Sequence, residues 1–430
     1  MASPAEEDLK KALSDLKSQN PSLGIPKIHA LLLASHPDWT VSEKRTRKIL
    51  QSQGLVQSGQ SSIIVPTSRL ISGLDVKKWT TKVEPRYFDK RRGKGLVAVE
   101  PISEGELIWK EDPLVLAPEW DYFDKQVRGV ACWHCSTPLQ HTGLEVPCRA
   151  DGSSANYCPA RFCNRLCLVR SDKTHALLCP AQNPASSKLL RYARDKQWLA
   201  LYAYAQVIAR FILENQNDAA ALKEDLEVVR SFAQIGMEER FRNSAAVLGQ
   251  EPDREAWKRG HELLVQTFFD PPTADGKKKL KKIIRKPLSP ELEKELLDYD
   301  TGFLSGIGLM NLNLENHGGL YVLHSHMNHS CQPNVSVRHL DPRTALSRIF
   351  MVAKTDIAPG EELVVSYVDP NMSYNRRQAE LRQWGFNCTC PRCLEQAKDA
   401  KVAAPAHGEA REGLDIGELE RELKLGLGVM

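Results

Sequence analysis

The chain has 430 residues, which is too long for a single hydrophobic core and favours two to four domains. Its 42% apolar content is typical of a globular protein, and a net charge of +4 is too small over this length to indicate nucleic-acid binding by itself. No apolar run has the length of a membrane span and the first residues lack a secretory segment, so we expect a soluble intracellular protein without membrane contact. In a reducing compartment its eleven cysteines are expected to bind metal rather than form disulfides.

Residues 1–56 are predicted to form a small all-helical unit. Ser3 and Glu6 have the spacing of a capping box, and Ser42 is expected to cap a third helix that stops at Gly54. That third helix is basic, with Lys44, Arg45, Arg47 and Lys48. The unit resembles helix-turn-helix modules, which implies contact with DNA; a docking module with a solvated basic face is the alternative.

A linker is expected over residues 57–77, followed by the main domain. Within Arg92–Val99, Gly93 and Gly95 precede a β-prone run. Such glycines let a backbone approach a ligand closely, although ordinary hairpins show the same pattern.

Residues 132–179 contain seven cysteines, which together with His175 are enough for two closed tetrahedral zinc sites. The ending Cys-x3-Cys-x7-His-x3-Cys resembles a MYND zinc finger. The resemblance implies two interleaved ligand sets: Cys132, Cys135, Cys163 and Cys167 in one, and Cys148, Cys158, His175 and Cys179 in the other. Nine residues separate Cys148 from Cys158, where the family usually has two. A finger of this kind is structural or protein-binding, and a reduced loop without metal is the alternative.

Residues 180–299 are predicted to be a helical insert that carries a basic loop. Apolar residues recur at spacings of three and four, which indicates core packing. Seven of the ten residues in 277–286 are basic. This run is interpreted as a solvated segment, a nuclear localisation signal or a contact with nucleosomal DNA.

Three histidines, His324, His326 and His329, lie near one another and raise the question of a metal site. We expect none, because we see no acidic ligand nearby, and His324 and His326 are interpreted as hydrogen-bonded loop or strand residues. A second set of thiols follows at Cys388-x-Cys390-x2-Cys393, and Cys331 is the only other cysteine in this half of the chain. Four such thiols suit a zinc site that fixes the C-terminal segment against residues 328–334.

The order Asn328-His329-Ser330-Cys331-x-Pro333-Asn334, then Tyr367, then the cysteine triad resembles the SET-domain lysine methyltransferases. With the finger, it is similar to the group whose SET domain is split by a MYND-like finger, and to its fungal branch acting on histone four. The resemblance implies an α+β SET fold of small sheets. Its expected parts are a SET N-terminal part over 78–131, the finger over 132–179, the insert over 180–299, the SET C-terminal part over 300–370, a post-SET zinc segment over 371–394 and a tail over 395–430.

The resemblance also implies roles for single residues. Tyr367 is the expected catalytic residue, and the expected S-adenosylmethionine contacts are Lys94, Gly95, Asn313, Asn328, His329, Tyr367 and Phe386. About three structural zinc sites are implied. The expected partner is a histone or nucleosome, with a nuclear location at chromatin and a cytoplasmic pool. A methyltransferase of non-histone proteins and a non-catalytic adaptor are the alternatives.

Overall fold

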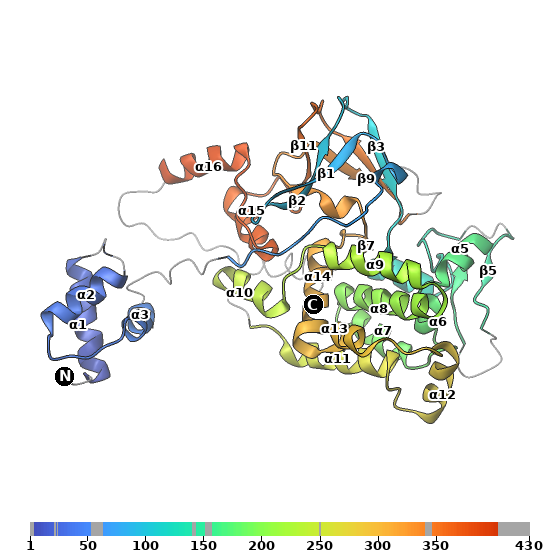
Figure 1. Ribbon diagram of the computed structural model, residues 1–430, viewed down its shortest axis with the longest axis horizontal. Helices are drawn as coiled ribbons and strands as arrows, with labels where there is room; N and C mark the ends of the chain where they lie inside the picture. Colours follow the sequence, from blue (N-terminus) through green and yellow to red (C-terminus); the bar gives the residue numbers. More distant parts are fainter. Residues whose placement is uncertain are drawn as a thin grey trace. The chain divides into compact units, whose positions relative to one another are not determined.

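The computed structural model describes residues 4–20, 23, 25–52, 63–139, 143–150, 157–248, 251–339 and 346–402. The chain divides into two compact units, Met1–Ile63 and Ile64–Met430 (Figure 1). The predicted tail lies outside the described residues from 403 onward, as do residues 57–62 of the predicted linker. From Ile64 the chain is already hydrogen-bonded into the second unit, because the Ile64 amide donates to the Asn243 side chain at 2.8 Å. No helix in the described part of the chain is long and apolar enough to cross a membrane.

The first unit is a three-helix bundle, as the sequence predicts, made of α1 (Glu6–Gln19), α2 (Ile25–Ser35) and α3 (Glu43–Ser52). Its core is a cluster of fully buried aliphatic side chains that includes Leu13. Ser42 does cap α3, since its hydroxyl accepts from the Arg45 amide at 3.2 Å. The predicted capping box is wrong: Ala5 occupies the N-cap of α1, no side chain caps this helix, and Ser3 lies outside the described residues.

The second unit contains small sheets, which confirms a mixed α+β fold. The first has the strand order β1–β2–β11–β8 and the second β3–β10–β9, and β4 pairs with β7. Both larger sheets enclose one apolar core that contains Leu96, Met351 and Leu363. The strands are β1 (Val83–Asp89), β2 (Gly93–Ala98), β3 (Leu107–Glu111), β4 (Val115–Leu116), β7 (Gly319–Leu320), β8 (Asn328–His329), β9 (Val335–Arg338), β10 (Ile349–Ala353) and β11 (Glu362–Val365).

One glycine is required where β4 meets β7. Gly318 has a φ of +85°, and a Cβ there would fall 1.5 Å from the Ala117 carbonyl oxygen. Only glycine combines this conformation with so close an approach.

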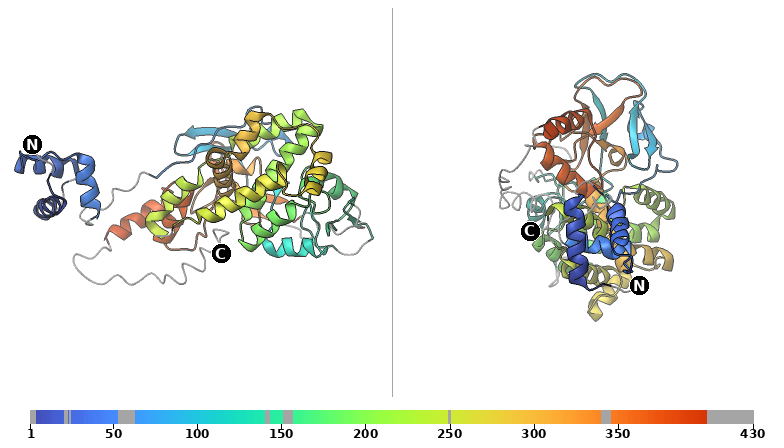
Figure 2. Two further views of the ribbon diagram at one scale, coloured as in Figure 1. Left: turned by 90° about the horizontal axis from the view of Figure 1, so that it is seen from below. Right: turned by 90° about the vertical axis from the view of Figure 1, so that its left-hand side faces the viewer.

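The insert forms the larger core, around α8 (Leu199–Asn217). This helix is buried on nearly every side, which explains its apolar sequence. Figures 1 and 2 show the neighbouring helices around it. The helices that pack on it include α7 (Ser186–Asp195), α9 (Ala219–Ser231), α11 (Arg254–Phe268) and α14 (Leu304–Asn313). The insert also contains α10 (Met237–Leu248), α12 (Ala274–Ile283) and α13 (Pro290–Leu297), and α4 (Trp120–Val127) comes earlier in the chain.

The predicted basic loop is wrong, because residues 274–283 form the helix α12. Its start is capped by Thr273, whose hydroxyl accepts from the Gly276 amide at 3.1 Å. Leu280 is buried and anchors the helix to the large core. The density of charge concealed this amphipathic pattern in the sequence.

The finger and the C-terminal segment complete the unit with short elements. The finger has the hairpin β5 (Val146–Pro147) and β6 (Arg161–Phe162), then α5 (Arg165–Ser171) and α6 (His175–Leu178). The C-terminal segment has α15 (Tyr374–Leu381), a 3₁₀ turn at Arg382–Trp384 and α16 (Pro391–Val402).

Candidate functional site

Strand pairing brings together segments that are far apart in the sequence. β2 pairs antiparallel with β11, with Val97 opposite Glu362, and β8 pairs in parallel with β11, with Asn328 opposite Val364. The glycine-rich stretch and Asn328-His329, predicted to be parts of one site, are therefore neighbours (Figure 1).

Asn328 connects the two parts of this sheet through its side-chain amide. Its Nδ2 donates to the Lys94 carbonyl oxygen at 3.0 Å and to Glu362 Oε1 at 2.8 Å. A Cβ on Gly95 would lie 2.3 Å from the Phe88 ring and 3.1 Å from that same amide nitrogen. Only glycine fits between these side chains, and the expected close approach of the backbone to a ligand stays a prediction.

The Lys94 side chain is buried, with 4% of its surface exposed. Its Nζ donates to the Ser325 hydroxyl at 3.2 Å and lies 5.2 Å from the centre of the Phe232 ring. No carboxylate lies within 4.0 Å of it in the part of the chain that the structure describes. Burial, with a smaller effect from Arg69, lowers the pKa of Lys94 to about 7.

Tyr367 follows β11 and points its hydroxyl at the turn before Asn328. The hydroxyl donates to the Met327 carbonyl oxygen at 2.7 Å. Burial, with a smaller effect from Glu315, raises the pKa of Tyr367, so the phenol is protonated at neutral pH and acts as a hydrogen-bond donor.

His329 holds Tyr367 from the backbone side. Its Nδ1 accepts from the Tyr367 amide at 3.0 Å, which requires that nitrogen to be unprotonated. Burial and the nearby Arg377 lower the pKa of His329 to about 4, so the ring is neutral. Its other nitrogen lies 3.3 Å from Cys331 Sγ.

An aromatic group surrounds this pair. The Phe386 ring centre lies 5.8 Å from that of His329 and 6.3 Å from that of Tyr367, which places Phe386 beside the predicted site. Trp384 lies 5.9 Å from Tyr367 and was missed by the sequence reasoning. Its position two residues before Phe386 was the sequence feature that could have identified Trp384 as part of the site.

Glu111, which sequence reasoning also missed, fixes the turn that carries the Met327 carbonyl. Its buried carboxylate accepts from the amides of Leu323 and His324, at 2.8 and 3.0 Å, where the 3₁₀ turn His324–His326 begins. The Met327 amide then donates to the His324 carbonyl at 2.9 Å. Glu111 thus positions the acceptor of Tyr367 from the end of β3.

The expectation that no acidic residue accompanies the histidines is wrong. Glu315 Oε1 is hydrogen-bonded to His324 Nε2. Burial alone would lower the pKa of His324, but Glu315 outweighs it and the pKa is raised. His326 Nδ1 faces the Val322 and Leu323 carbonyls at 3.1 and 3.2 Å. Each ring is therefore held through one nitrogen, whereas His324 Nδ1 and His326 Nε2 are buried with no hydrogen-bond partner among the described residues.

Asn313 lies at the end of α14, where its side chain bonds to backbone. Its Oδ1 accepts from the Ala233 amide at 3.2 Å, and its Nδ2 donates to the carbonyls of Ala233 and Leu309 at 2.8 and 2.7 Å. Both hydrogens of the side-chain amide and one lone pair of its oxygen are used, which leaves one lone pair of Oδ1 for a ligand. The role of Asn313 as a cofactor contact stays a prediction.

The predicted metal ligands gather in three groups, each with its ligand atoms within 4.8 Å of one another. The groups match the predicted sets: Cys132, Cys135, Cys163 and Cys167; Cys148, Cys158, His175 and Cys179; and Cys331, Cys388, Cys390 and Cys393. The hairpin closes the long gap between Cys148 and Cys158, because the Cys148 amide donates to the Ala160 carbonyl at 2.9 Å.

Distances within these groups fit a zinc ion. Tetrahedral zinc with Zn–S bonds of about 2.3 Å places sulfurs about 3.8 Å apart and an imidazole nitrogen about 3.5 Å from each sulfur. Observed Sγ–Sγ distances are 3.7 Å for Cys135–Cys163, 3.8 Å for Cys148–Cys179 and 3.5 Å for Cys331–Cys393. His175 Nε2 lies 3.3 and 3.6 Å from the sulfurs of Cys148 and Cys158.

The C-terminal group has a buried cation beside it. Arg377 on α15 is fully buried, and its Nε donates to Cys331 Sγ at 3.2 Å. The guanidinium also lies 3.9 Å from Cys393 Sγ and donates to Gln396 Oε1 at 2.5 Å. Four thiolates around Zn²⁺ leave a net charge of about −2, which this cation offsets.

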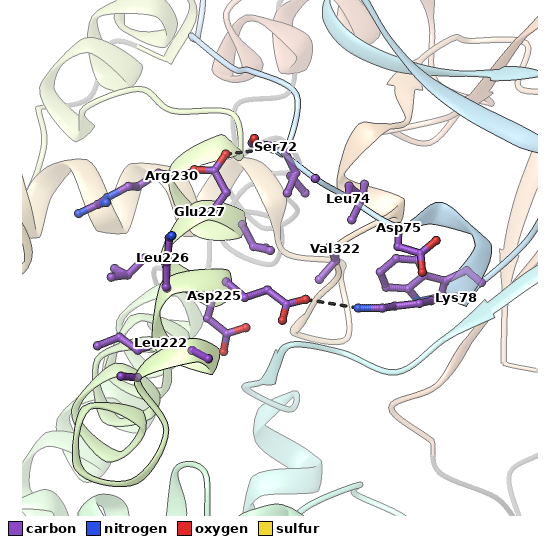
Figure 3. Close-up of a pocket in the computed structure, with 18 residues that line it drawn as sticks. Ser72, Leu74, Asp75, Lys78, Leu222, Asp225, Leu226, Glu227, Arg230 and Val322 are labelled. Atoms are coloured by element: carbon purple, nitrogen blue, oxygen red, sulfur yellow. Dashed lines mark hydrogen bonds and ion pairs between the residues drawn. The ribbon is translucent and has the colours of Figure 1, made fainter.

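A cavity of about 750 Å³ lies between α9 and the segment that leads into β1, and Figure 3 shows the residues that line it. The Lys78–Glu224 ion pair crosses it at 3.5 Å, and Glu227 accepts from the Ser72 amide at 3.0 Å. Val322, at the edge of the histidine turn, also lines it. These rim groups already have partners, so the cavity offers a ligand few free polar contacts.

Comparisons with known proteins agree with this arrangement. The SET-domain profile matches residues 93–368. Histone-lysine N-methyltransferase SET5 of Mycosarcoma maydis is 32% identical, over 72% of this chain and 67% of that protein. The protein of the same name from Meyerozyma guilliermondii is 30% identical, over 95% of this chain and 83% of that one. Among solved structures, the chain resembles the SET domain of LSMT bound to lysine and AdoHcy, over 77% of this chain and 62% of that chain at 13% identity. The TM-score of 0.36 is too low for this likeness to support an argument. On the profile match and these relatives, the chain belongs to the SET-domain family.

Proposed function

We propose that this chain is an S-adenosylmethionine-dependent histone-lysine N-methyltransferase. The observation that carries the proposal is the similarity, over most of both chains, to fungal proteins named histone-lysine N-methyltransferase SET5. The geometry around Tyr367 supports it, because the phenol, the Met327 carbonyl and the Asn328-His329 pair meet at one place.

S-adenosylmethionine, when bound, supplies a methyl group on a positively charged sulfur. The residues that would hold it are Lys94, Gly95, Asn328, His329, Tyr367 and Phe386, with Asn313 as a further contact. One feature fits this ligand: among the described residues, the buried Lys94 ammonium has only a hydroxyl partner, and the carboxylate of an amino-acid ligand would complete it.

The protein's own residues would align the two reactants. A lysine amine must be neutral to accept a methyl group, yet its ordinary pKa is about 10.4. A dry, apolar channel lowers that pKa by removing water from the ammonium. Tyr367, a donor with its proton retained, would orient the reacting groups rather than remove a proton.

The substrate class follows from the relatives, and histone four is our choice within it, by resemblance to the fungal branch. The same resemblance supports the split SET and MYND grouping, in which the finger contacts a protein partner. Each of the three ligand groups would hold one structural Zn²⁺. We place the protein in the nucleus at chromatin, with a cytoplasmic pool.

DNA contact is part of the proposal, through the N-terminal helices or residues 277–286. In the first unit the basic surface is smaller than the sequence indicates, because Arg45 turns back to donate to the Pro4 carbonyl at 2.9 Å.

The test is transfer of a labelled methyl group from S-adenosylmethionine to nucleosomes, to each free core histone and to a cell extract. Tyr367→Phe should lower turnover by about 100-fold, since a misplacement of the reacting groups by about 1 Å can cost that much, and should leave cofactor affinity within about threefold. Tyr87→Phe makes the same chemical change at an exposed tyrosine of β1 and should act as wild type.

Three outcomes would change the proposal. Label only on extract proteins would indicate a non-histone substrate. Cofactor binding without label on any protein would contradict the enzyme assignment. Absence of cofactor binding as well would favour the adaptor.

A further inference from the structure

Helix α12 is anchored to the protein along one side. Gly276 and Leu280 are buried, and Ile283 and Ile284 pack against the large core. Just past the helix end, the amides of Arg285 and Lys286 donate to Gln216 Oε1 at 2.9 and 2.8 Å. A dense run of positive charge is thus held in a defined place on the helical insert, where the sequence predicted a basic loop.

The lysines of α12 divide into two classes. Lys277 and Lys279 flank the buried side and pair with Asp270 and Asp275, at 2.7 and 3.3 Å. The opposite side presents three lysines at helical spacings of three and four, and two further exposed cations follow just past the helix end. We name this set the basic face: Lys278, Lys281, Lys282, Arg285 and Lys286.

All five members of the basic face are exposed, and within the described residues none has a carboxylate within 4.0 Å. Surface cations are usually interspersed with acidic residues, whose attraction relieves the repulsion between like charges. Here acidic partners stand only at the flanks, and the basic face is left with uncompensated charge. Such a surface attracts a polyanion.

The chemistry of the face favours phosphates. Four of its five members are lysines, which act as compact point charges on flexible stems, whereas planar carboxylates are matched better by arginine forks. A membrane surface would need apolar side chains beside the cations, and the apolar side of α12 is buried in the core.

We propose that the basic face binds the phosphate backbone of DNA without sequence preference, and that it holds the enzyme on nucleosomes. The role on nucleosomes rests on the proposed histone substrate, whereas DNA binding itself does not. The face lies on the insert, so it adds a contact outside the Tyr367 site.

The test uses the full chain and a labelled DNA duplex of about 30 base pairs, with affinity measured by fluorescence anisotropy over a range of NaCl concentrations. In Lys278→Gln/Lys282→Gln, two phosphate contacts are lost. The slope of log affinity against log salt should become shallower by about 1.8, at about 0.9 for each contact, and affinity at low salt should fall about tenfold or more.

The matched control is Lys277→Gln/Lys279→Gln, which removes the same two charges from the same helix. It should keep the wild-type slope and change affinity by no more than about threefold, because those lysines are paired with aspartates. If both variants lowered DNA affinity equally, the effect would come from net charge alone and the proposal would be overturned. Unchanged DNA affinity in both variants would overturn it as well.

Two parallel measurements separate other partners. If the basic-face variant keeps its DNA affinity but loses binding to histone dimers, the face recognises carboxylates. If it instead loses binding to anionic lipid vesicles, the face is a membrane contact. Since no methyl transfer is measured, a failure of the proposed enzymatic function would leave this test unaffected.

Discussion

At the scale of single residues, Lys94 combines a cost to stability with a proposed role in binding. Its folded-state pKa of about 7 lies below the ordinary value of 10.5, so the folded protein resists protonating it. The ammonium therefore destabilises the cofactor-free fold at every pH below 10.5, with the full effect below about pH 7. Buried charges without partners are found at functional sites, where a ligand completes them.

Lys94→Met should raise the melting temperature of the cofactor-free protein by about 2–6 °C at pH 7 and by much less near pH 10. The same change should weaken binding of S-adenosylmethionine about tenfold or more, because its carboxylate loses the opposite charge. Scanning calorimetry and titration calorimetry measure the two effects. As a control, Ser325→Ala removes the only hydrogen-bond partner of Nζ among the described residues and leaves the charge, so it should lower the melting temperature. Unchanged cofactor affinity in Lys94→Met would refute its role in the site.

At the scale of elements, the C-terminal segment connects a metal group to the aromatic side chains around Tyr367. Cys331 follows His329 by two residues, and Cys388 follows Phe386 by two, so closing the thiol group brings both rings together. Arg377, from α15, contacts two of these sulfurs as well as Gln396 of α16. The helices thus depend on the thiol group for their position, and a Zn²⁺ held there would depend on Arg377 for part of its charge balance.

Arg377→Met should speed the loss of one Zn²⁺ of the proposed three to a chelator by about 10–100-fold, the range typical for residues that support metal ligands. The neighbouring Arg376→Met, whose side chain pairs with Glu380, should release zinc as wild type does. Zinc per chain, counted by mass spectrometry during chelation, gives the rates. Equal rates in both variants would mean that Arg377 only fills space; an additional loss of cofactor affinity in Arg377→Met would support the coupling to Phe386.

At the scale of the whole molecule, the sequence was informative where function depends on short motifs. Spacing predicted the C-terminal ligand group, and the resemblance to a MYND finger implied the other two, even across the gap between Cys148 and Cys158. It could not predict Glu111 or Arg377, since their partners come from distant segments and become neighbours only through strand pairing and helix packing. The helix α12 was missed for a different reason. Only a few of its side chains are apolar, so their helical spacing is hard to recognise among the basic residues, and the packing of Leu280 in the large core stabilises the helix.

The two units have separate cores, so we expect two unfolding transitions in calorimetry of the full chain. The first unit relies on a small cluster of buried aliphatic side chains, and domains of about 60 residues have low stability.

Leu13 and Leu189 are both fully buried, one in each unit. Leu13→Ala should cost about 2–5 kcal/mol, which is enough to abolish the minor transition, and should leave the major transition and methyl transfer to free histone unchanged. Leu189→Ala, the same truncation in α7, should lower only the major transition. A single transition that both variants shift would show that the units unfold together, and the N-terminal helices would then act as a structural part of the catalytic unit.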